Sequence, residues 1–172
     1  TYLPKLIRAG ERVAICEQLE DPKQAKKIVK RGVTELVTPG VSYNDLVLTH
    51  NKNNFLASVS YVKSKVGVAF LDLSTGEFLV GEGDASYVDK LLQSFNPAEV
   101  IYQKSKREKF QLDFGSEFYS FLLDDWVFTL DYCSELLINQ FKIKSLKGFG
   151  ISKLYAGTIA AGICLHYLKE TQ

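Results

Sequence analysis

The stretch Val66-Gly-Val-Ala-Phe-Leu-Asp-Leu73 is almost entirely apolar, and the turn signal Ser74-Thr75-Gly76 follows it directly. A short apolar run that ends at a turn is typical of a strand buried on both faces. Two further strand-like stretches flank it, Phe55–Val62 before the run and Glu77–Gly81 after the turn. The sequence therefore predicts three consecutive antiparallel strands, with the apolar run at the centre.

Helices and strands alternate after these three strands. Asp84 can cap a helix whose apolar residues recur at helical spacing on one face, at Val88, Leu91, Leu92 and Phe95. Asn96-Pro97 ends this helix, and Glu99–Gln103 follows as a fourth strand. A short helix is expected in the charged stretch 104–118, and a fifth strand over Tyr119–Leu123.

Two more helices complete the pattern. One lies near 129–142 and carries a core stripe made of Leu130, Cys133, Leu137 and Phe141. The other begins at a Ser152 cap, runs to about Glu170 and is apolar nearly all round, so it needs neighbours on several sides. The fold class is therefore α/β, a mixed sheet of three antiparallel strands extended by parallel strand–helix units and flanked by helices. This is the ribonuclease H-like order.

The first 42 residues differ from this pattern and predict an N-terminal α/β remnant. Val13–Gln18 is predicted as a strand, and Asp21-Pro22 as the start of a basic helix. The helix would carry the lysines Lys23, Lys26, Lys27 and Lys30. A second strand, Val33–Val37, ends at Pro39-Gly40. Residues 43–53 form a polar linker. Because the chain starts with Thr1 and contains no Met, we expect it to be an excised fragment.

Composition and charge restrict the possible functions. Hydrophobic residues make up 46% of the chain and charged residues 24%, as in ordinary globular proteins, and no apolar run could span a bilayer. The net charge is +1, with +2 in residues 1–45 and −1 in 46–172. Nucleic-acid binders usually carry a clear basic excess, so the larger part is a poor candidate for holding DNA by itself.

The sequence predicts no catalytic, cofactor-binding or metal-binding residues. Ribonuclease H-like nucleases hold two metal ions with converging carboxylates, one of them on the first strand. Here Phe55–Val62 contains no acid. The remaining candidates are Asp72, Glu77, Asp124 and Asp125, and the first two flank a turn where they are expected to be solvated or to cap the turn. No glycine-rich segment is followed by the Lys-Ser or Lys-Thr of a phosphate loop. His50 and His166 are isolated, and the three Cys show no disulfide or zinc spacing.

Several short strings, taken in order, resemble the MutS family of bacterial DNA mismatch-repair proteins. They run from one end of the chain to the other and include Val13-Ala-Ile-Cys-Glu-Gln18, Val37-Thr-Pro-Gly40, Leu71-Asp-Leu-Ser-Thr-Gly-Glu-Phe78, Asn96-Pro-Ala-Glu99, Gly148-Phe-Gly150 and Ala160-Ala-Gly162. The resemblance implies that 1–42 is the end of the mismatch-recognition domain. It implies that 54–150 is the ribonuclease H-like connector domain. It also implies that 151–172 is the first helix of the lever, or core, domain, so the neighbours of this all-apolar helix would be missing from the chain.

The same resemblance implies what the parent protein does. The parent would bind mismatched duplex DNA, with a Phe-x-Glu motif upstream of Thr1, and would hydrolyse ATP with Mg²⁺ in a domain downstream of Gln172. It would act in the bacterial cytoplasm, as a homodimer. The connector itself would carry no cofactor and no enzymatic activity. It would relay the state of the DNA-binding part to the ATPase part and back, and it would dock the next repair protein, MutL.

The family's docking surface includes two adjacent Gln on the helix that corresponds to 129–142. Aligned through Trp126, these positions fall at Glu135 and Leu136, so this sequence departs from the family at both. At about 100° per residue, Glu135 points away from the core stripe and Leu136 lies on its flank, where a partner could reach them. We therefore expect a MutL contact at Glu135 and Leu136. For the basic helix with the four lysines, a DNA-proximal position and a solvated charged face both stay open.

Two alternatives remain open at this stage. A divalent-metal ribonuclease H-like nuclease is disfavoured by the acid-free first strand. A stand-alone DNA-binding module is disfavoured by the near-zero charge.

Overall fold

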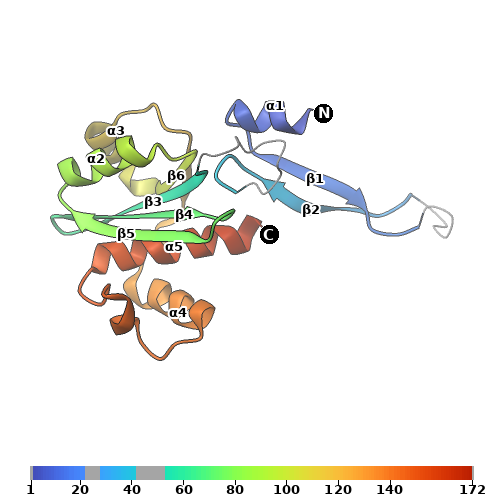
Figure 1. The fold of residues 1–172 in the computed structure, drawn as a ribbon. Helices are drawn as coiled ribbons and strands as arrows, with labels where there is room; N and C mark the ends of the chain where they lie inside the picture. Colours follow the sequence, from blue (N-terminus) through green and yellow to red (C-terminus); the bar gives the residue numbers. More distant parts are fainter. Residues whose placement is uncertain (1, 22–27, 42–52, 172) are drawn as a thin grey trace.

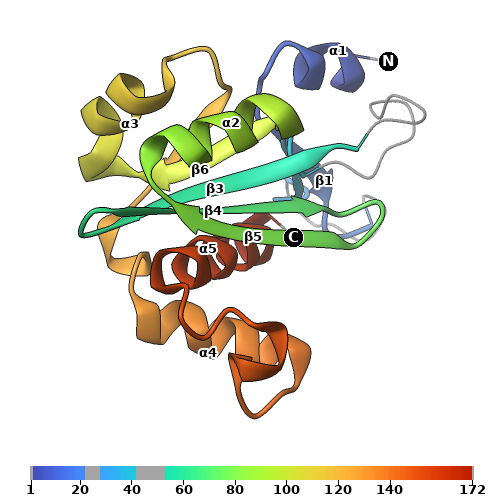
Figure 2. The ribbon, with the colours of Figure 1, turned by 60° about the vertical axis from the view of Figure 1, so that its left-hand side comes forward.

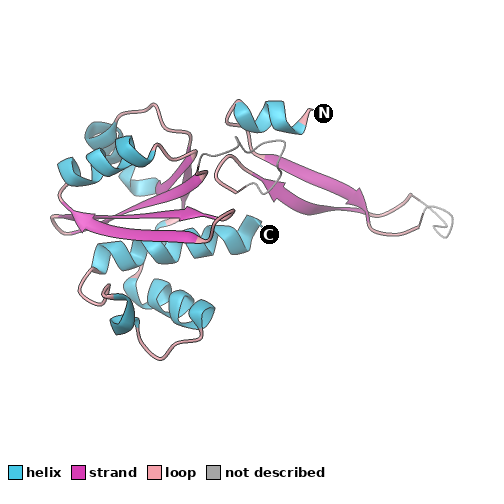
Figure 3. Cartoon of the chain, viewed as in Figure 1, coloured by secondary structure: helices cyan, strands magenta, loops and turns pink. Residues whose placement is uncertain are grey.

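The computed structural model of the chain describes residues 2–21, 28–41 and 53–171. A five-stranded sheet lies between two layers of helices (Figures 1 and 2). A long two-stranded hairpin projects from one end of this body (Figure 1). Helices α2 and α3 cover one face of the sheet. Helix α5 covers the other face, with α4 packed beneath it (Figure 3).

The described residues form helices and strands whose order after residue 54 is the predicted one. Their bounds are α1 Leu3–Arg8, β1 Val13–Gln18, β2 Arg31–Val37, β3 Phe55–Val62, β4 Lys65–Asp72, β5 Glu77–Gly83, α2 Ala85–Phe95, β6 Glu99–Gln103, α3 Arg107–Phe114, β7 Ser120–Leu123, α4 Leu130–Phe141 and α5 Tyr155–Thr171. Short 3₁₀ turns lie at Lys104–Lys106 (η1), Asp125–Val127 (η2) and Leu146–Phe149 (η3).

The sheet has the strand order β5-β4-β3-β6-β7. Strands β3, β4 and β5 are antiparallel, while β6 pairs parallel to β3 and β7 parallel to β6. The apolar strand β4 lies between β3 and β5, and all of its residues after Lys65 are buried. The predicted α/β class and the mixed sheet are confirmed.

The start and end signals of α2 are also confirmed. The Asp84 carboxylate accepts a hydrogen bond from the backbone N–H of Tyr87 at 2.8 Å, which caps the first turn. At the other end Asn96 takes a left-handed conformation with φ 43°, which closes the helix.

Helix α5 packs unusually close to the sheet. A Cβ added to Gly67 on β4 would lie 2.1 Å from the carbonyl carbon of Ala156, so only glycine fits there. Ser60 on β3 donates its hydroxyl to the Ala156 carbonyl at 2.6 Å, and Ser58 donates to the carbonyl of Ala160. These bonds satisfy the two serine hydroxyls in an otherwise apolar layer.

The partners of α5 are present in this chain. Every residue from Ala156 to Tyr167 is buried, between β3 and β4 on one side and α4 on the other. On the α4 side a Cβ at Gly162 would lie 2.3 Å from the Cβ of Cys133. The expectation that this all-apolar helix lacks its neighbours is therefore wrong. Its assignment to a separate lever domain stays a prediction.

The predicted start of α5 at Ser152 is also wrong. The helix begins at Tyr155, and Ser152 lies in a turn before it. The cap comes from β5, where the Glu82 carboxylate accepts the backbone N–H groups of Ala156 at 2.7 Å and Gly157 at 3.2 Å. A carboxylate at this position also interacts favourably with the helix dipole.

The predicted basic helix is not found where its C-terminal end is described. Lys23, Lys26 and Lys27 lie outside the described residues. Residues 28–30 are not helical, and the N–H of Lys30 donates to the Glu20 carboxylate at 2.8 Å as the chain enters β2. Lys30 therefore belongs to the antiparallel hairpin β1–β2, whose pairing runs from Gln18 opposite Arg31 to Val13 opposite Val37.

Within the described residues, no helix combines the length and the apolar character needed to cross a membrane.

The close approach of α5 predicts a large effect of one methyl group. We expect Gly67→Ala to lower the free energy of unfolding by about 3 kcal/mol, because β4 and α5 must separate to admit the Cβ. Gly148→Ala is the matched control, since a Cβ there meets nothing within 4 Å. Urea unfolding followed by circular dichroism measures both. Equal stabilities of the two variants would contradict this close packing.

Candidate functional site at the hairpin–sheet junction

A buried carboxylate joins the hairpin, the sheet and α5. Glu99 opens β6 and is only 2% exposed. Its Oε2 accepts hydrogen bonds from the Thr38 hydroxyl at 2.6 Å and from the backbone N–H of Gly40 at 3.1 Å. Its Oε1 accepts the hydroxyl of Tyr167 at 2.6 Å. Three donors from two distant segments thus satisfy a group that would be costly to bury unpaired.

The segment after β2 is shaped to reach this carboxylate. Thr38 and Val41 pair through their backbones in a tight turn, and the Val41 N–H also donates to the Thr38 hydroxyl at 3.2 Å. A Cβ on Gly40 would lie 2.7 Å from Leu56 and 3.0 Å from the Cβ of Glu99. The turn can therefore approach the sheet this closely only with glycine at position 40.

An aromatic contact forms a second tie between the hairpin and the body. The Arg12 guanidinium, just before β1, lies 3.6 Å from the ring centroid of Phe121 on β7 and 5.5 Å from that of Tyr167. Burial and the neighbouring Glu99 carboxylate raise the pKa of Tyr167 far above its usual value. The phenol is therefore protonated at neutral pH and available as a donor to Glu99.

Asp72, at the end of β4, forms a third tie. It accepts the N–H of Asn54 at 3.1 Å and both the N–H and the hydroxyl of Ser74, at 2.8 and 2.6 Å. The Asn54 amide in turn donates to the carbonyl of Pro39 at 2.9 Å. Burial acts to raise the pKa of Asp72, but the hydrogen bonds from Ser74, Asn54 and Thr75 outweigh it and lower the pKa overall.

The other acids considered for a nuclease centre lie apart. Glu77 accepts the side-chain amide of Asn53 at 2.8 Å. Asp124 pairs with Lys104 at 2.5 Å, and Asp125 accepts the backbone N–H of Ser105. In the part of the chain that the structure describes, no three His, Cys, Asp or Glu residues are grouped closely enough to hold a metal ion. The prediction that Asp72 caps its turn is confirmed, but its carboxylate is buried, not solvated.

The predicted partner-contact residues lie at a different place. Glu135 is exposed and Leu136 half-buried on α4, beyond α5 from the sheet. Lys30 lies on the projecting hairpin, so the structure does not bring it together with these two residues (Figure 1). A MutL contact at Glu135 and Leu136 stays a prediction.

The sequence analysis does not predict that Thr38, Gly40, Glu99 and Tyr167 meet in one site, although two signals are available. Glu99 is an acid at the start of an otherwise apolar strand, and Tyr167 carries one of the few polar groups on an all-apolar helix. Both patterns indicate buried polar groups that need partners. Nothing local in the sequence indicates that Thr38 and Gly40 supply the remaining donors.

The junction predicts a specific loss of stability. We expect Glu99→Gln to lower the free energy of unfolding by about 2–3 kcal/mol, because the amide has one acceptor oxygen and leaves either Tyr167 or the Thr38 turn unpaired. Glu108→Gln, exposed on α3, is the control and should change stability by less than about 0.5 kcal/mol. Equal effects in thermal or urea unfolding would mean that the carboxylate does not hold the junction.

The hydrogen bonds to Asp72 predict that the stability of the fold depends on pH. Its pKa in the folded chain lies below the value of about 3.9 expected in the unfolded chain, so its stabilisation is complete above that pH and is lost as the pH falls through the folded value. Asp72→Asn should therefore be less stable than the wild type near pH 7, and the difference should shrink as the pH falls below about 3.9, the pKa expected in the unfolded chain. Urea unfolding at a series of pH values measures this. A constant difference would contradict the assignment.

Two family models match successive parts of the chain. Residues 1–45 match the family model described as MutS domain I, and residues 54–172 match MutS domain II. Over all 172 residues the chain is 60% identical to the DNA mismatch repair protein MutS of Bacteroides thetaiotaomicron and 59% identical to that of Flavobacterium johnsoniae. It spans 20% of the length of each relative. The chain belongs to the MutS family, and its two parts match domains I and II of that family.

Proposed function

We propose that this chain is a non-catalytic connector in a DNA mismatch-repair protein. The parent would bind mismatched duplex DNA, act as a homodimer in the bacterial cytoplasm, and hydrolyse ATP with Mg²⁺ in a domain outside this chain. The connector would relay state between the DNA-binding and ATPase parts and dock a MutL-like protein. The family membership supports the repair role of the parent.

The buried Glu99 carboxylate is the observation that carries the relay role. It bonds the turn at the base of the hairpin through Thr38 and the long helix α5 through Tyr167. A movement of the hairpin away from the sheet would leave a buried charge or hydroxyl without its partner, which is costly. Displacement of the hairpin is therefore opposed unless β6 and α5 move with it, which is the behaviour required of a connector.

The sheet topology supports a ribonuclease H-like assignment of the connector. Three antiparallel strands are followed by two parallel strands on the far side of β3. In nucleases of this class the first strand carries a metal-binding carboxylate. Here the first strand, β3, has serines, and Ser58 and Ser60 bond to α5. These positions support a structural role for β3, and we propose no enzymatic activity and no cofactor for this chain.

The docking role is proposed for the outer side of α4. Glu135 is exposed beside the half-buried Leu136, a combination that a partner can contact without disturbing the buried stripe at Cys133 and Leu137. The net charge of +1 favours a protein partner over DNA for this chain. Any DNA contact at Lys23, Lys26, Lys27 or Lys30 would depend on the rest of the parent.

The test is a calorimetric titration of the chain with the N-terminal domain of MutL from the same source. We expect saturable binding in the micromolar range, lost in the double variant Glu135→Arg with Leu136→Asp. The matched control is Glu108→Arg with Leu112→Asp, an exposed acid and an exposed leucine on α3, on the opposite face of the sheet. Circular dichroism checks that both variants are folded.

Two results would contradict the proposal. If Glu135→Arg with Leu136→Asp binds as tightly as the control, the docking surface lies elsewhere. If the chain instead binds mismatched duplex DNA with an affinity that falls steeply with salt, a stand-alone DNA-binding module is the better description.

A further inference from the structure

An open apolar pocket lies beside α5, and neither Glu135 nor the residues of the junction line it. It has a volume of about 410 Å³ and is bounded by the edge strand β5, the end of α4 and the loop that contains η3. Its main lining side chains are Phe78, Val80, Leu137, Phe141, Phe149 and Ile151.

Two aromatic side chains that line this pocket are themselves exposed to solvent. Phe141 is 42% exposed and Phe149 is 55% exposed. Phe141 lies between the other two rings, with its centroid 6.4 Å from that of Phe78 and 5.5 Å from that of Phe149. Packed rings of this kind offer a rigid apolar surface that needs little ordering when a ligand binds.

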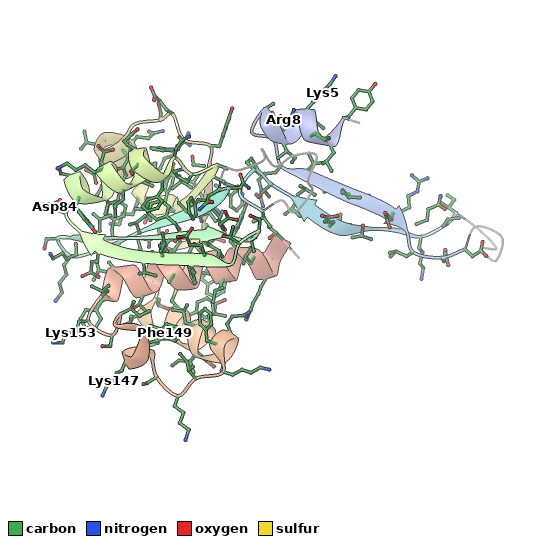
Figure 4. All side chains as sticks on the ribbon, viewed as in Figure 1. Lys5, Arg8, Asp84, Lys147, Phe149 and Lys153 are labelled. Carbon is green, nitrogen blue, oxygen red and sulfur yellow. The ribbon has the colours of Figure 1, made fainter. Side chains whose placement is uncertain are left out.

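The loop around the pocket is strongly basic. Residues 142–153 contain four lysines and no acid, and the lysines are Lys142, Lys144, Lys147 and Lys153. All four are exposed, and across residues 2–21, 28–41 and 53–171 none of them forms an ion pair. Figure 4 places Lys147, Phe149 and Lys153 at the same end of the molecule, below the sheet. We call this surface the lysine-rimmed pocket.

The acids on the neighbouring elements do not neutralise this charge. Glu77 on β5 accepts the amide of Asn53, and Glu82 caps α5 at Ala156. Between Glu135 on α4 and Glu170 near the end of α5 the sequence has no acid at all. The pocket therefore combines an apolar lining with an adjoining loop whose four lysines form no ion pair among the described residues.

We propose that the lysine-rimmed pocket docks an acidic peptide segment of a partner protein, with one large apolar side chain inserted among the three phenylalanine rings. Charge complementarity selects the acidic flanks, and the concave pocket selects the apolar anchor. A flat membrane surface or a nucleic-acid backbone would use the lysines but leave the pocket empty. The surface is distinct from the docking site proposed above, because Phe141 lies roughly 140° around α4 from Leu136.

The test uses fluorescence anisotropy with a labelled acidic peptide of sequence Asp-Glu-Asp-Leu-Phe-Glu-Asp-Glu. The comparison peptide has both apolar residues replaced by Ser and keeps the same charge. We expect micromolar binding of the first peptide, weakened at least about tenfold in the second, since burial of a large apolar side chain is worth that much or more. Binding of the first peptide should also weaken as salt is raised.

Variants of the chain locate the site. Phe149→Ser and the charge reversal Lys144→Glu with Lys147→Glu should each weaken binding by about tenfold. Their matched controls are Leu112→Ser and Lys90→Glu with Arg107→Glu, exposed residues on the opposite face of the sheet, which should leave affinity within about twofold. Glu135→Arg with Leu136→Asp should also leave it unchanged.

Three outcomes would overturn the proposal. The first is no binding of the acidic peptide at millimolar concentration by a chain whose circular dichroism spectrum is that of a folded protein. The second is equal binding of the two peptides, which would mean that only the charge of the peptide contributes to binding and that no apolar side chain enters the pocket. The third is binding of phosphatidylserine vesicles or of single-stranded DNA that is lost with the lysine reversal but unaffected by Phe149→Ser.

Discussion

The burial of one carboxylate, Glu99, sets the constraint on which the arrangement of the chain depends. With its side chain enclosed at the start of β6, it requires donors, and the chain supplies them from Thr38 and Gly40 on one side and Tyr167 on the other. Loss of any partner would leave a buried polar group unsatisfied, so the hairpin, the sheet and α5 are stabilised only together. The contact of Arg12 with Phe121 and Tyr167 strengthens the same junction.

A second constraint is the short distance between α5 and the sheet. Gly67 leaves room for the backbone of the helix, and Ser58 and Ser60 fill the interface with hydroxyl groups that bond to helix carbonyls. On the far side Gly162 admits Cys133 of α4. The helix is therefore held between two layers by small residues, and its end presents Tyr167 to Glu99. The close packing and the polar junction both follow from the position of α5 between the sheet and α4.

Much of the sheet could be predicted from the sequence because its signals are local. The apolar run at β4, the turn before β5, the Asp84 cap of α2 and the bounds of β6 all depend on residues close together in the chain. The errors occurred where a local signal competed with a distant partner. Ser152 is a good capping residue, yet Glu82 from β5 caps α5 instead. Lys30 continues a basic helical pattern, yet it bonds to Glu20 across the hairpin.

The sequence by itself determined the family, the α/β class and the order of the strands and helices, because periodicity, turn residues and short strings are readable along the chain. Only the tertiary structure decided which buried polar groups meet and what covers the all-apolar helix. It also decided that three phenylalanines from three elements line one pocket beneath a basic loop. The physical reason is that hydrogen bonds and packing between residues 60 to 100 positions apart depend on how the layers fold together, and no local pattern encodes that distance.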